Sequence, residues 1–434
     1  MAAVTSLRET SWSSDSTVST LNIEDLLRMM VTVDASDLHI KAGSPPGLRV
    51  HGELKPIEGF APLEAKDCKA LTDQLLDGPE RREEYERNRE LDFSSGITGL
   101  ARFRINLFHQ RDSRAAVLRK IPMEVPKIED MGFPPVLKDL SEKPRGLVLV
   151  TGPTGSGKST TLASMIDYIN RTQAGHILTI EDPIEFSHND KQCFVNQREI
   201  GGDSLSFSNA LRAALREDPD VILVGEMRDL ETTALAITAA ETGHLVFGTL
   251  HTTSAIQTVD RVIDVFPHEA QQQVRMQLSV SLQGVISQTL LPKIGGGRAC
   301  AQEIMVATAG VRACIREGKT PQLVNALQTG ASTGMITLEK ALVQLVKDGL
   351  VTPDEAVSKA NHPASVADEL SRCGMAPKNF QPEPEAREQA GSDSRCAQRA
   401  VSRRDAPKSA EATVGGGGGM ADDFEKFRAR RSKA

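Results

Sequence analysis

Short runs of consecutive apolar residues in the middle of the chain are typical of strands that are buried on both faces. These runs occur at residues 147–150, 221–224 and 245–247, and segments with helical spacing separate them. Because parallel sheets carry helices on both faces, this order predicts an α/β domain with a parallel sheet over residues 145–365. In residues 21–121, apolar and polar positions alternate in several short segments, which predicts a smaller α/β domain with half-buried strands.

The segments outside these two domains have a different composition. Prolines punctuate residues 122–144, which we interpret as a linker, and residues 1–20 are a flexible lead-in rich in Ser and Thr. Pro, Ser, Ala, Arg and Glu dominate residues 366–434, so we expect a disordered tail there. Its end, residues 422–433, suggests a docking peptide for a partner or a membrane surface, although plain disorder is the better supported interpretation.

Overall composition narrows the class of protein further. The 434 residues are 39% hydrophobic and 25% charged, with a formal net charge of −7, which suits folded domains and does not favour chain-wide binding of nucleic acid. No apolar run reaches the roughly 18–20 residues of a membrane-spanning helix, and no secretory signal is apparent, so we expect a cytoplasmic protein. The six cysteines form no CxxC pair, which argues against a zinc knuckle.

A phosphate-binding loop is the strongest chemical signal in the sequence. It satisfies the GxxxxGK[ST] pattern and directly follows the first apolar run. Its glycines let backbone N–H groups converge on phosphate oxygens, and the next helix presents its positive end. Lys158 is predicted to reach the β- and γ-phosphates of ATP, and the Ser159 hydroxyl to ligate Mg²⁺. The residues expected to contact the nucleotide are Gly152, Pro153, Thr154, Gly155, Ser156, Gly157, Lys158, Ser159 and Thr160.

Two acidic sites follow the ends of predicted strands. Glu181, Asp182 and Glu185 come shortly after an apolar pair, where a carboxylate can orient or deprotonate the attacking water. An acidic strand exit without chemistry is the alternative. Glu226 follows the second apolar run, in the position of a Walker B acid, and is predicted to hold Mg²⁺ through a water. Ligands of open parallel sheets bind beyond the carboxyl ends of the strands, so both sites are expected beside the phosphate loop.

Histidines and arginines supply further candidates. His244 and His251 flank the third apolar run, and without a nearby cysteine they do not favour a zinc site. We expect them to act as a γ-phosphate sensor or as a contact between subunits. The smaller domain contains a group of neighbouring arginines, which form either a solvated basic face or arginine fingers that neutralise charge on the transferred phosphoryl group: Arg102, Arg104, Arg111, Arg114 and Arg119.

Together these motifs resemble those of the type II/IV secretion ATPases and, within that family, those of the retraction ATPases of type IV pili. The resemblance covers residues 21–363 and rests on the phosphate loop, the acidic segment 179–185, the segment 211–228 and the histidine segment 243–252. It implies a PAS-like amino-terminal domain, a RecA-like P-loop ATPase domain and a homo-hexameric ring. It also implies work at the pilus base, peripheral to the inner membrane, with the inner-membrane platform protein and also the pilus-assembly ATPase as candidate partners.

The resemblance further implies roles for individual residues. Glu185 would be the catalytic base, with Glu181 and Asp182 as supporting acids, and Arg104 and Arg119 would be the arginine fingers. Retraction ATPases also carry a motif that is needed for retraction rather than for hydrolysis. Half of that motif is kept here, within residues 310–317, as Arg312, Ile315, Arg316 and Glu317.

We therefore expect an ATPase that drives pilus retraction and twitching motility. Pilus-assembly and type II secretion ATPases are the alternatives, but this sequence shows neither their additional amino-terminal domain nor their four-cysteine zinc insertion. A nucleic-acid-dependent RecA-like ATPase is disfavoured by the acidic charge and by an aromatic content of only 4%, so no nucleic acid is expected as a partner. A regulatory protein that does not hydrolyse ATP is disfavoured because Lys158, Ser159, Glu185 and Glu226 are intact.

Overall fold

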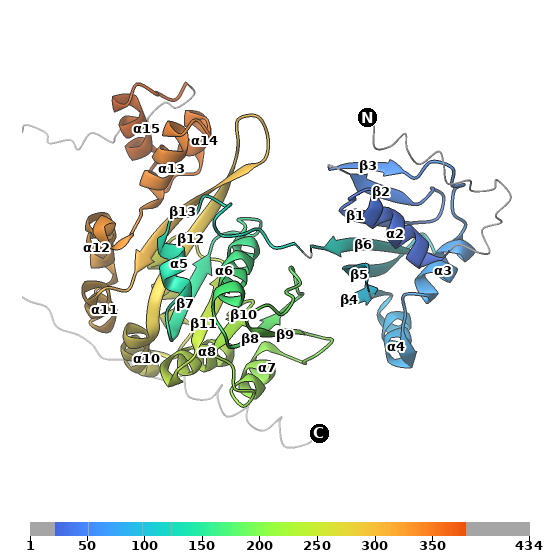
Figure 1. Ribbon diagram of the computed structural model, residues 1–434, viewed down its shortest axis with the longest axis horizontal. Helices are drawn as coiled ribbons and strands as arrows, with labels where there is room; N and C mark the ends of the chain where they lie inside the picture. The colour runs from blue at the N-terminus through green and yellow to red at the C-terminus, as the bar shows by residue number, and fades with distance from the viewer. Residues whose placement is uncertain (1–21, 51, 98, 123, 379–434) are drawn as a thin grey trace, which may run out of the picture. The chain divides into compact units, whose positions relative to one another are not determined.

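Two β-sheets organise the computed structural model (Figure 1), which describes residues 22–50, 52–97, 99–122 and 124–378. The first sheet lies in the amino-terminal segment and the second in the longer segment that follows, so the mixed α/β fold predicted from the sequence is confirmed. The predicted lead-in at 1–20, and the docking peptide at the end of the tail, lie outside the described residues. Within the described ranges, no helix is long and apolar enough to cross a bilayer.

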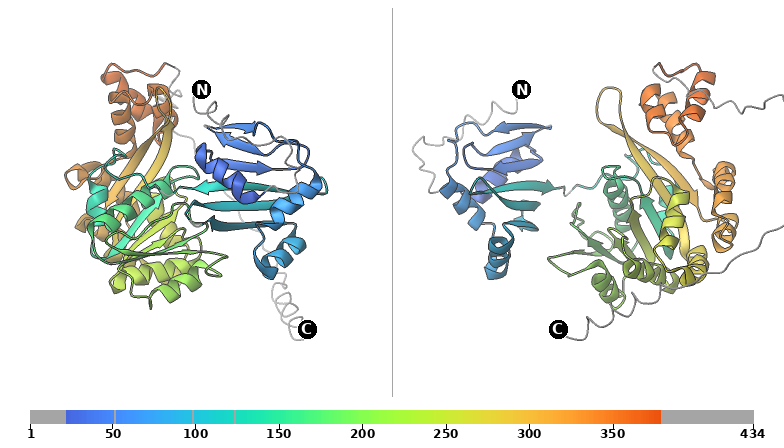
Figure 2. Two further views of the ribbon diagram at one scale, coloured as in Figure 1. Left: turned by 45° about the vertical axis from the view of Figure 1, so that its right-hand side comes forward. Right: turned by 180° about the vertical axis from the view of Figure 1, so that it is seen from behind.

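The first sheet is antiparallel throughout and has the strand order β3-β2-β1-β6-β5-β4. Its strands are β1 (Asp37–Ile40), β2 (Gly47–Val50), β3 (Glu53–Pro56), β4 (Glu90–Ile97), β5 (Ala101–Gln110) and β6 (Ser113–Ile121). Helices α2 (Ile23–Thr32) and α3 (Ala65–Asp73) pack on one face of this sheet (Figure 2), and α4 (Gly78–Asn88) adds Tyr85 to the same core.

The two faces of this sheet differ because successive side chains of a strand point to opposite sides. On β5, Phe103, Ile105 and Leu107 are buried in the core beneath the helices. Arg104 lies between them and is exposed, so it belongs to the opposite face. The alternation predicted for this domain is therefore confirmed, and among the described residues the helices of this domain leave one face of its sheet free.

The second sheet has the order β13-β12-β7-β11-β10-β8-β9. Strands that run parallel to their neighbours are β7 (Gly146–Thr151), β8 (His176–Glu181), β9 (Phe194–Glu199), β10 (Val221–Val224), β11 (Leu245–Leu250) and β12 (Leu282–Pro292). The edge strand β13 (Arg298–Val306) pairs antiparallel with β12. The three apolar runs form β7, β10 and β11 and are buried along their length, as predicted. The antiparallel edge was not predicted.

Helices cover both faces of the second sheet (Figure 1). One face packs against α5 (Val136–Ser141) and α6 (Lys158–Thr172). The other face packs against α7 (Phe207–Ala214), α8 (Leu230–Thr242), α9 (Ala255–Asp264), α10 (His268–Ser281), α11 (Ala309–Arg316) and α12 (Leu323–Thr329). A third cluster forms where α13 (Leu338–Lys347), α14 (Pro353–Ser358) and α15 (Pro363–Arg372) pack on the end of the β12–β13 hairpin.

Two boundaries of the larger domain differ from those predicted. The stretch interpreted as a linker contains α5 and buries Ile128 and Leu137 in the core of the second sheet, because apolar residues lie between its prolines. At the other end, α15 continues to Arg372 and buries Val366 and Leu370, so the folded chain extends past residue 365. Pro363 suggested an end, but proline is also favoured in the first turn of a helix, which is its place here.

Candidate functional site

The phosphate loop connects β7 to α6 and lines a cavity of about 740 Å³ at the carboxyl ends of the parallel strands. Its backbone depends on glycine, since Gly152, Gly155 and Gly157 all have positive φ angles, of 144°, 79° and 88°. A Cβ atom on Gly152 would lie only 2.3 Å from the carbonyl oxygen of Gln288 on β12. The loop is therefore shaped by its own sequence and by its close approach to the neighbouring strand.

Gln288 holds the phosphate loop from the side and was not predicted from the sequence. Its Nε2 donates to the carbonyl oxygen of Ser156 at 2.8 Å, and its Oε1 accepts from the Thr161 hydroxyl at 2.9 Å. The side chain is buried, and a buried amide with both ends bonded fixes its partners firmly. No sequence signal marks it, because β12 contains several polar residues and only the structure shows which of them is bonded to the phosphate loop.

Lys158 stands in the first turn of α6 and faces two carboxylates. Its ammonium group donates to the carbonyl oxygens of Gly152 at 2.9 Å and Pro153 at 3.2 Å. Burial lowers the pKa of Lys158, while the nearby charges of Glu185 and Glu226 oppose that shift. The structure thus brings the predicted lysine and two of the predicted acids to one cavity.

Glu181 ends β8 and is bonded on both carboxylate oxygens. Oε1 accepts from the Thr179 hydroxyl at 2.7 Å and from Gln197 Nε2 at 3.3 Å, and Oε2 accepts from the backbone N–H of Glu185 at 3.4 Å. Burial raises the pKa of Glu181 to about 7, with the charge of Glu185 adding to the rise and the hydrogen bonds opposing it. Its side chain therefore orients the start of the loop that carries Glu185.

Stability is expected to depend on pH through Glu181. Because its pKa rises from 4.5 to about 7 on folding, the folded chain keeps a proton that the unfolded chain releases in that interval. Stability should therefore fall as the pH rises through this window, and the loss should persist above it. Glu181→Gln cannot ionise, so its melting temperature should decline less than that of the native protein between about pH 5 and about pH 8. Asp182→Asn is the matched control, and an equal flattening there would contradict the assignment.

The other two acids of this segment are exposed and line the same cavity. Glu185 and Asp182 carry no side-chain hydrogen bond or ion pair within the described residues, which leaves their carboxylates free to contact a water or a nucleotide. The backbone around them is fixed by the burial of Ile184, whose N–H points to Glu199 Oε2 at 3.3 Å. The arrangement presents two free carboxylates from an anchored segment.

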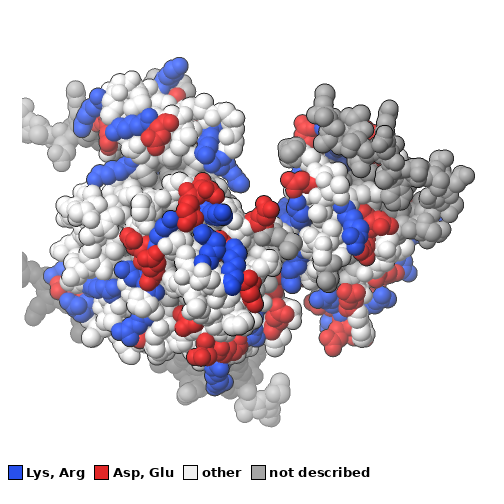
Figure 3. All heavy atoms as spheres, viewed as in Figure 1, with Lys and Arg blue, Asp and Glu red and all other residues white. Residues whose placement is uncertain are grey.

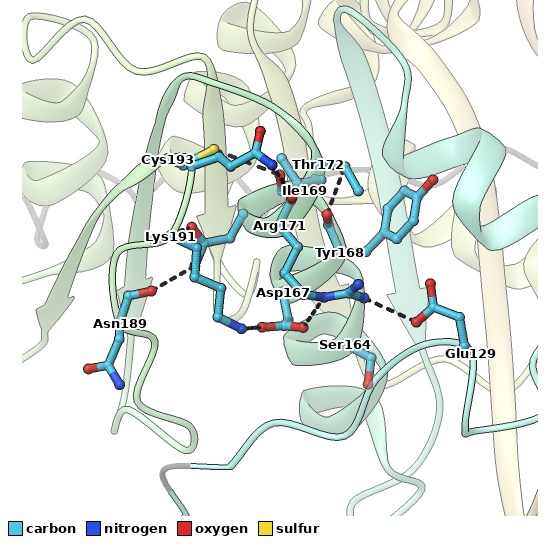
Figure 4. A network of polar contacts seen from close by, with 12 residues as sticks. Glu129, Ser164, Asp167, Tyr168, Ile169, Arg171, Thr172, Asn189, Lys191 and Cys193 are labelled. Atoms are coloured by element: carbon cyan, nitrogen blue, oxygen red, sulfur yellow. Dashed lines mark hydrogen bonds and ion pairs between the residues drawn. The ribbon is translucent and has the colours of Figure 1, made fainter.

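The loop beyond these acids is tied to α6 by a polar network (Figure 4). Asp167 is buried on α6 and bonds both Arg171, at 2.8 Å, and the ammonium group of Lys191. Asn170 accepts from the Lys191 backbone N–H at 3.1 Å and donates to the carbonyl oxygen of Asn189 at 2.8 Å. The helix that starts at the phosphate loop thus also anchors the far end of the acidic loop.

Glu226 follows β10, as expected of a Walker B acid, and lies in the cavity. Gly225 before it is needed for close packing, because a Cβ atom there would lie 3.0 Å from the carbonyl oxygen of Ile180 on β8. The Glu226 carboxylate pairs with Arg228 at 2.7 Å. It can therefore be held in place by that arginine while it faces the phosphate loop.

The two histidines lie at opposite ends of β11 and do not form one site. His251 follows the carboxyl end and lines the cavity, where burial and the charge of Lys158 lower its pKa. His244 precedes the strand, and its Nδ1 lies 3.0 Å from the carbonyl oxygen of Ala239 at the end of α8. A six-residue strand spans about 20 Å, so the predicted role of γ-phosphate sensor is wrong for His244 within this chain, while the predicted contact between subunits stays a prediction.

Arg104 and Arg119 lie on the first sheet and are absent from the lining of the cavity. They are directly opposite each other on β5 and β6, and both are exposed on the face free of helices. The other predicted arginines differ in setting: Arg114 is bonded to Asp73 at 2.6 Å and to Glu86.

The segment predicted as a retraction motif contains residues that bond or pack within the domain and residues that are exposed. The Arg312 guanidinium donates to the carbonyl oxygens of Ala307, Ser279 and Val280 and to the side chain of Gln283, at 2.8, 2.9, 2.6 and 3.2 Å. It therefore caps α10 and joins it to α11 and β12. The remaining members are the buried Ile315 and the exposed Arg316 and Glu317.

Several cavity residues were missed by sequence reasoning. The start of β13 contributes Arg298 and Cys300, and the acidic loop contributes His188, whose pKa burial lowers to about 4. Thr249 at the end of β11 donates its hydroxyl to the carbonyl oxygen of Gly225. Arg298, Cys300 and His188 lie outside the motifs, and only the topology places these residues together with Thr249.

Comparison with known proteins places these features in context. The family described as Type II/IV secretion system protein matches residues 97–351, which include the phosphate loop and every acid of the cavity. Over 343 residues the chain is 56% identical to the Type IV pilus retractation ATPase PilT of Pseudomonas aeruginosa, a match that covers 79% of this chain and 99% of that protein.

Two further similarities agree with the first. The chain is 51% identical over 323 residues to the Twitching motility protein of Neisseria gonorrhoeae, which covers 74% of this chain and 86% of that protein. A solved structure described as the pilus retraction motor PilT with bound ADP matches at a TM-score of 0.75 and 49% identity, and the match covers 81% of this chain and 99% of that one.

Proposed function

The chain belongs to the type II/IV secretion system protein family, and from this premise we propose that it is an ATP-hydrolysing motor that retracts type IV pili and drives twitching motility. The observation that carries the proposal is the set of groups on one cavity: the glycine-rich loop, Lys158, Glu185 and Glu226. These are the parts that phosphoryl transfer to water requires, since catalysis there consists of positioning and charge stabilisation.

The nucleotide binds with its phosphates on the loop at the start of α6. Backbone N–H groups of residues 154–159 and the helix end attract the phosphate charge, and Lys158 exchanges its bonds to the loop carbonyls for phosphate oxygens. Ser159 and Glu226 offer the hydroxyl and carboxylate that suit Mg²⁺, and the ion, when bound, neutralises charge on the phosphates. His251, at the same edge, is placed to contact the γ-phosphate.

Water activation is assigned to Glu185. Its carboxylate is exposed and unpartnered among the described residues, so it can accept a proton from a water beside the phosphates. Glu181 has both oxygens engaged and instead bonds the Glu185 backbone. Asp182 lines the cavity and supports the negative charge of the site.

The motor is proposed to work as a homo-hexamer of two-domain subunits. The amino-terminal domain with its six-stranded sheet is assigned as PAS-like, and the domain with the phosphate loop as RecA-like. Arg104 and Arg119 are the arginine fingers, which a ring allows one subunit to supply to its neighbour. Rigid-body rotation between the two domains would then couple hydrolysis to movement.

The proposed partner is the inner-membrane platform protein of the pilus machine, with the pilus-assembly ATPase as a second candidate. The motor would lie in the cytoplasm, peripheral to the inner membrane at the pilus base. Deleting the gene in a piliated host tests this directly: surplus pili with no twitching support retraction. Absence of pili would instead identify an assembly ATPase.

Arg312→Ala is expected to affect both stability and retraction. Loss of the four hydrogen bonds that join α10, α11 and β12 should lower the free energy of unfolding by about 1–3 kcal/mol. Arg316→Ala is the matched control, because Arg316 is exposed and its removal should leave the melting temperature unchanged. Thermal unfolding measures the effect of each variant on stability, and a twitching assay measures its effect on retraction. An unchanged melting temperature in Arg312→Ala would contradict the capping role.

A nucleic-acid-dependent ATPase is the second candidate, and surface charge does not favour it. On the face seen in Figure 3, Lys and Arg side chains are interspersed with Asp and Glu and form no continuous basic stripe among the described residues. Binding of a nucleic-acid backbone requires such a stripe. Stimulation of ATP hydrolysis by single-stranded DNA would support this alternative.

A further inference from the structure

A row of charged residues crosses the helix-free face of the first sheet. The strand register places Arg49 on β2 opposite Asp37 on β1, Asp37 opposite Arg119 on β6, and Arg119 opposite Arg104 on β5. The row thus contains three arginines and a single acid. The acid stands between two of the arginines, and sequence reasoning did not identify it.

Asp37 is buried, and its carboxylate is fully engaged. Oδ1 accepts from Arg119 Nε at 2.8 Å. Oδ2 accepts from the Ser36 hydroxyl at 2.8 Å and lies 3.5 Å from Arg49 Nε. Its side chain is only 4% exposed, so the carboxylate has a fixed position from which to hold a partner.

Arg119 is held at one end and free at the other. Its contact with Asp37 is made through Nε, and its side chain is 67% exposed. No other polar contact of this guanidinium occurs within the described residues. A guanidinium anchored through Nε presents its two terminal nitrogens as a fork, the geometry that suits a phosphate group.

The contact between Asp37 and Arg119 matters because a second arginine lies beside Arg119. Arg104 is directly opposite Arg119, and like charges in that position on a sheet repel. Without Asp37, Arg119 would be free to turn away from Arg104. With Asp37, the Arg119 guanidinium is kept on the face of the sheet that also carries Arg104.

We propose that Asp37 is a positioning residue for ATP hydrolysis, which holds Arg119 so that its terminal nitrogens, together with Arg104, face a phosphate group. This inference rests on the proposed function, in which Arg119 is an arginine finger. Asp37 itself does not contact the nucleotide.

The test measures steady-state ATP hydrolysis by the full chain with Mg²⁺ over a range of ATP concentrations. Asp37→Ala should lower kcat by roughly 10- to 100-fold, since a misplaced catalytic group costs about that much. KM should change little, because the phosphate loop is untouched. Asp37→Asn keeps an oxygen that can accept from Nε, so it should retain more activity than Asp37→Ala.

Arg49→Ala is the matched control for the removal of a charge beside Asp37. It removes the more distant arginine and leaves the Oδ1 contact to Arg119 in place, so kcat should stay within about 2-fold. Thermal unfolding and size-exclusion chromatography of each variant check folding and assembly. If Asp37→Ala does not fold, kcat of the native protein is compared with kcat of Asp37→Asn, whose side chain has nearly the same shape as that of Asp37.

A double variant distinguishes positioning from a general structural role. If Asp37 acts through Arg119, Asp37→Ala should cause no further loss of kcat in an Arg119→Ala background. An equal loss in both backgrounds, or native kcat in a folded Asp37→Ala, would overturn the inference while the motor assignment stands. Native kcat in Arg119→Ala would instead remove the arginine finger from the proposed function, and the role of Asp37 with it.

Discussion

Glu185→Gln is expected to lower the rate of ATP hydrolysis by roughly 10²–10⁴-fold, the contribution usual for a general base. The amide has nearly the shape of the carboxylate but cannot accept the proton of the attacking water. ATP should still bind, because the phosphate loop and Lys158 are unchanged. Single-turnover hydrolysis and equilibrium binding of a fluorescent ATP analogue measure the two effects separately.

Glu181→Gln is the natural comparison for this variant. Glu181 lines the same cavity, but its oxygens are engaged by Thr179, by Gln197 and by the Glu185 backbone. An amide can keep one accepting oxygen there, so we expect a smaller loss of turnover than in Glu185→Gln. Normal turnover in Glu185→Gln with strong loss in Glu181→Gln would reassign the base to Glu181.

Lys158→Ala is expected to remove both tight nucleotide binding and turnover. The phosphates lose the ammonium group beside the phosphate loop, and removal of one such group typically lowers turnover by roughly 10²–10³-fold. The variant also removes the positive charge with which Glu185 and Glu226 now interact. Isothermal titration with ATP and a turnover assay check the two losses.

Lys158→Arg serves as the control for charge. It keeps a cation but replaces a compact ammonium group with a larger planar one, which does not fit the loop carbonyls of Gly152 and Pro153 in the same way. We expect weak binding to return without full turnover. Native turnover in Lys158→Ala would contradict the assignment of the phosphate loop.

Local patterns predicted strands β7, β10 and β11 of the larger domain and the loop between β7 and α6. Both follow from short-range rules: apolar runs form buried strands, and GxxxxGK[ST] forms a phosphate loop only after a strand. The acids at the ends of β8 and β10 were predicted for a related reason, since parallel strands end at one edge of a sheet.

Contacts between distant segments could not be predicted in the same way. Gln288 follows Ser156 by more than a hundred residues, and only the strand order β12–β7 brings them together. The separation of His244 from His251, by contrast, follows from their places at the two ends of one strand, and the sequence pattern already predicts it. Asp37 was not predicted because its role depends on Arg119, and only the register of β1 with β6 places the two residues opposite each other.

Strand β12 also has a mechanical consequence. Near its start, Gln283 is bonded to Arg312, and five positions later Gln288 is bonded to the phosphate loop. These two bonded residues lie about 17 Å apart along a strand whose backbone is already extended and can hardly lengthen. A displacement of the loop therefore cannot be absorbed within the strand: it must move α10 and α11 as well, or break a buried hydrogen bond. Strand β12 therefore transmits a displacement of the nucleotide-binding loop to helices α10 and α11.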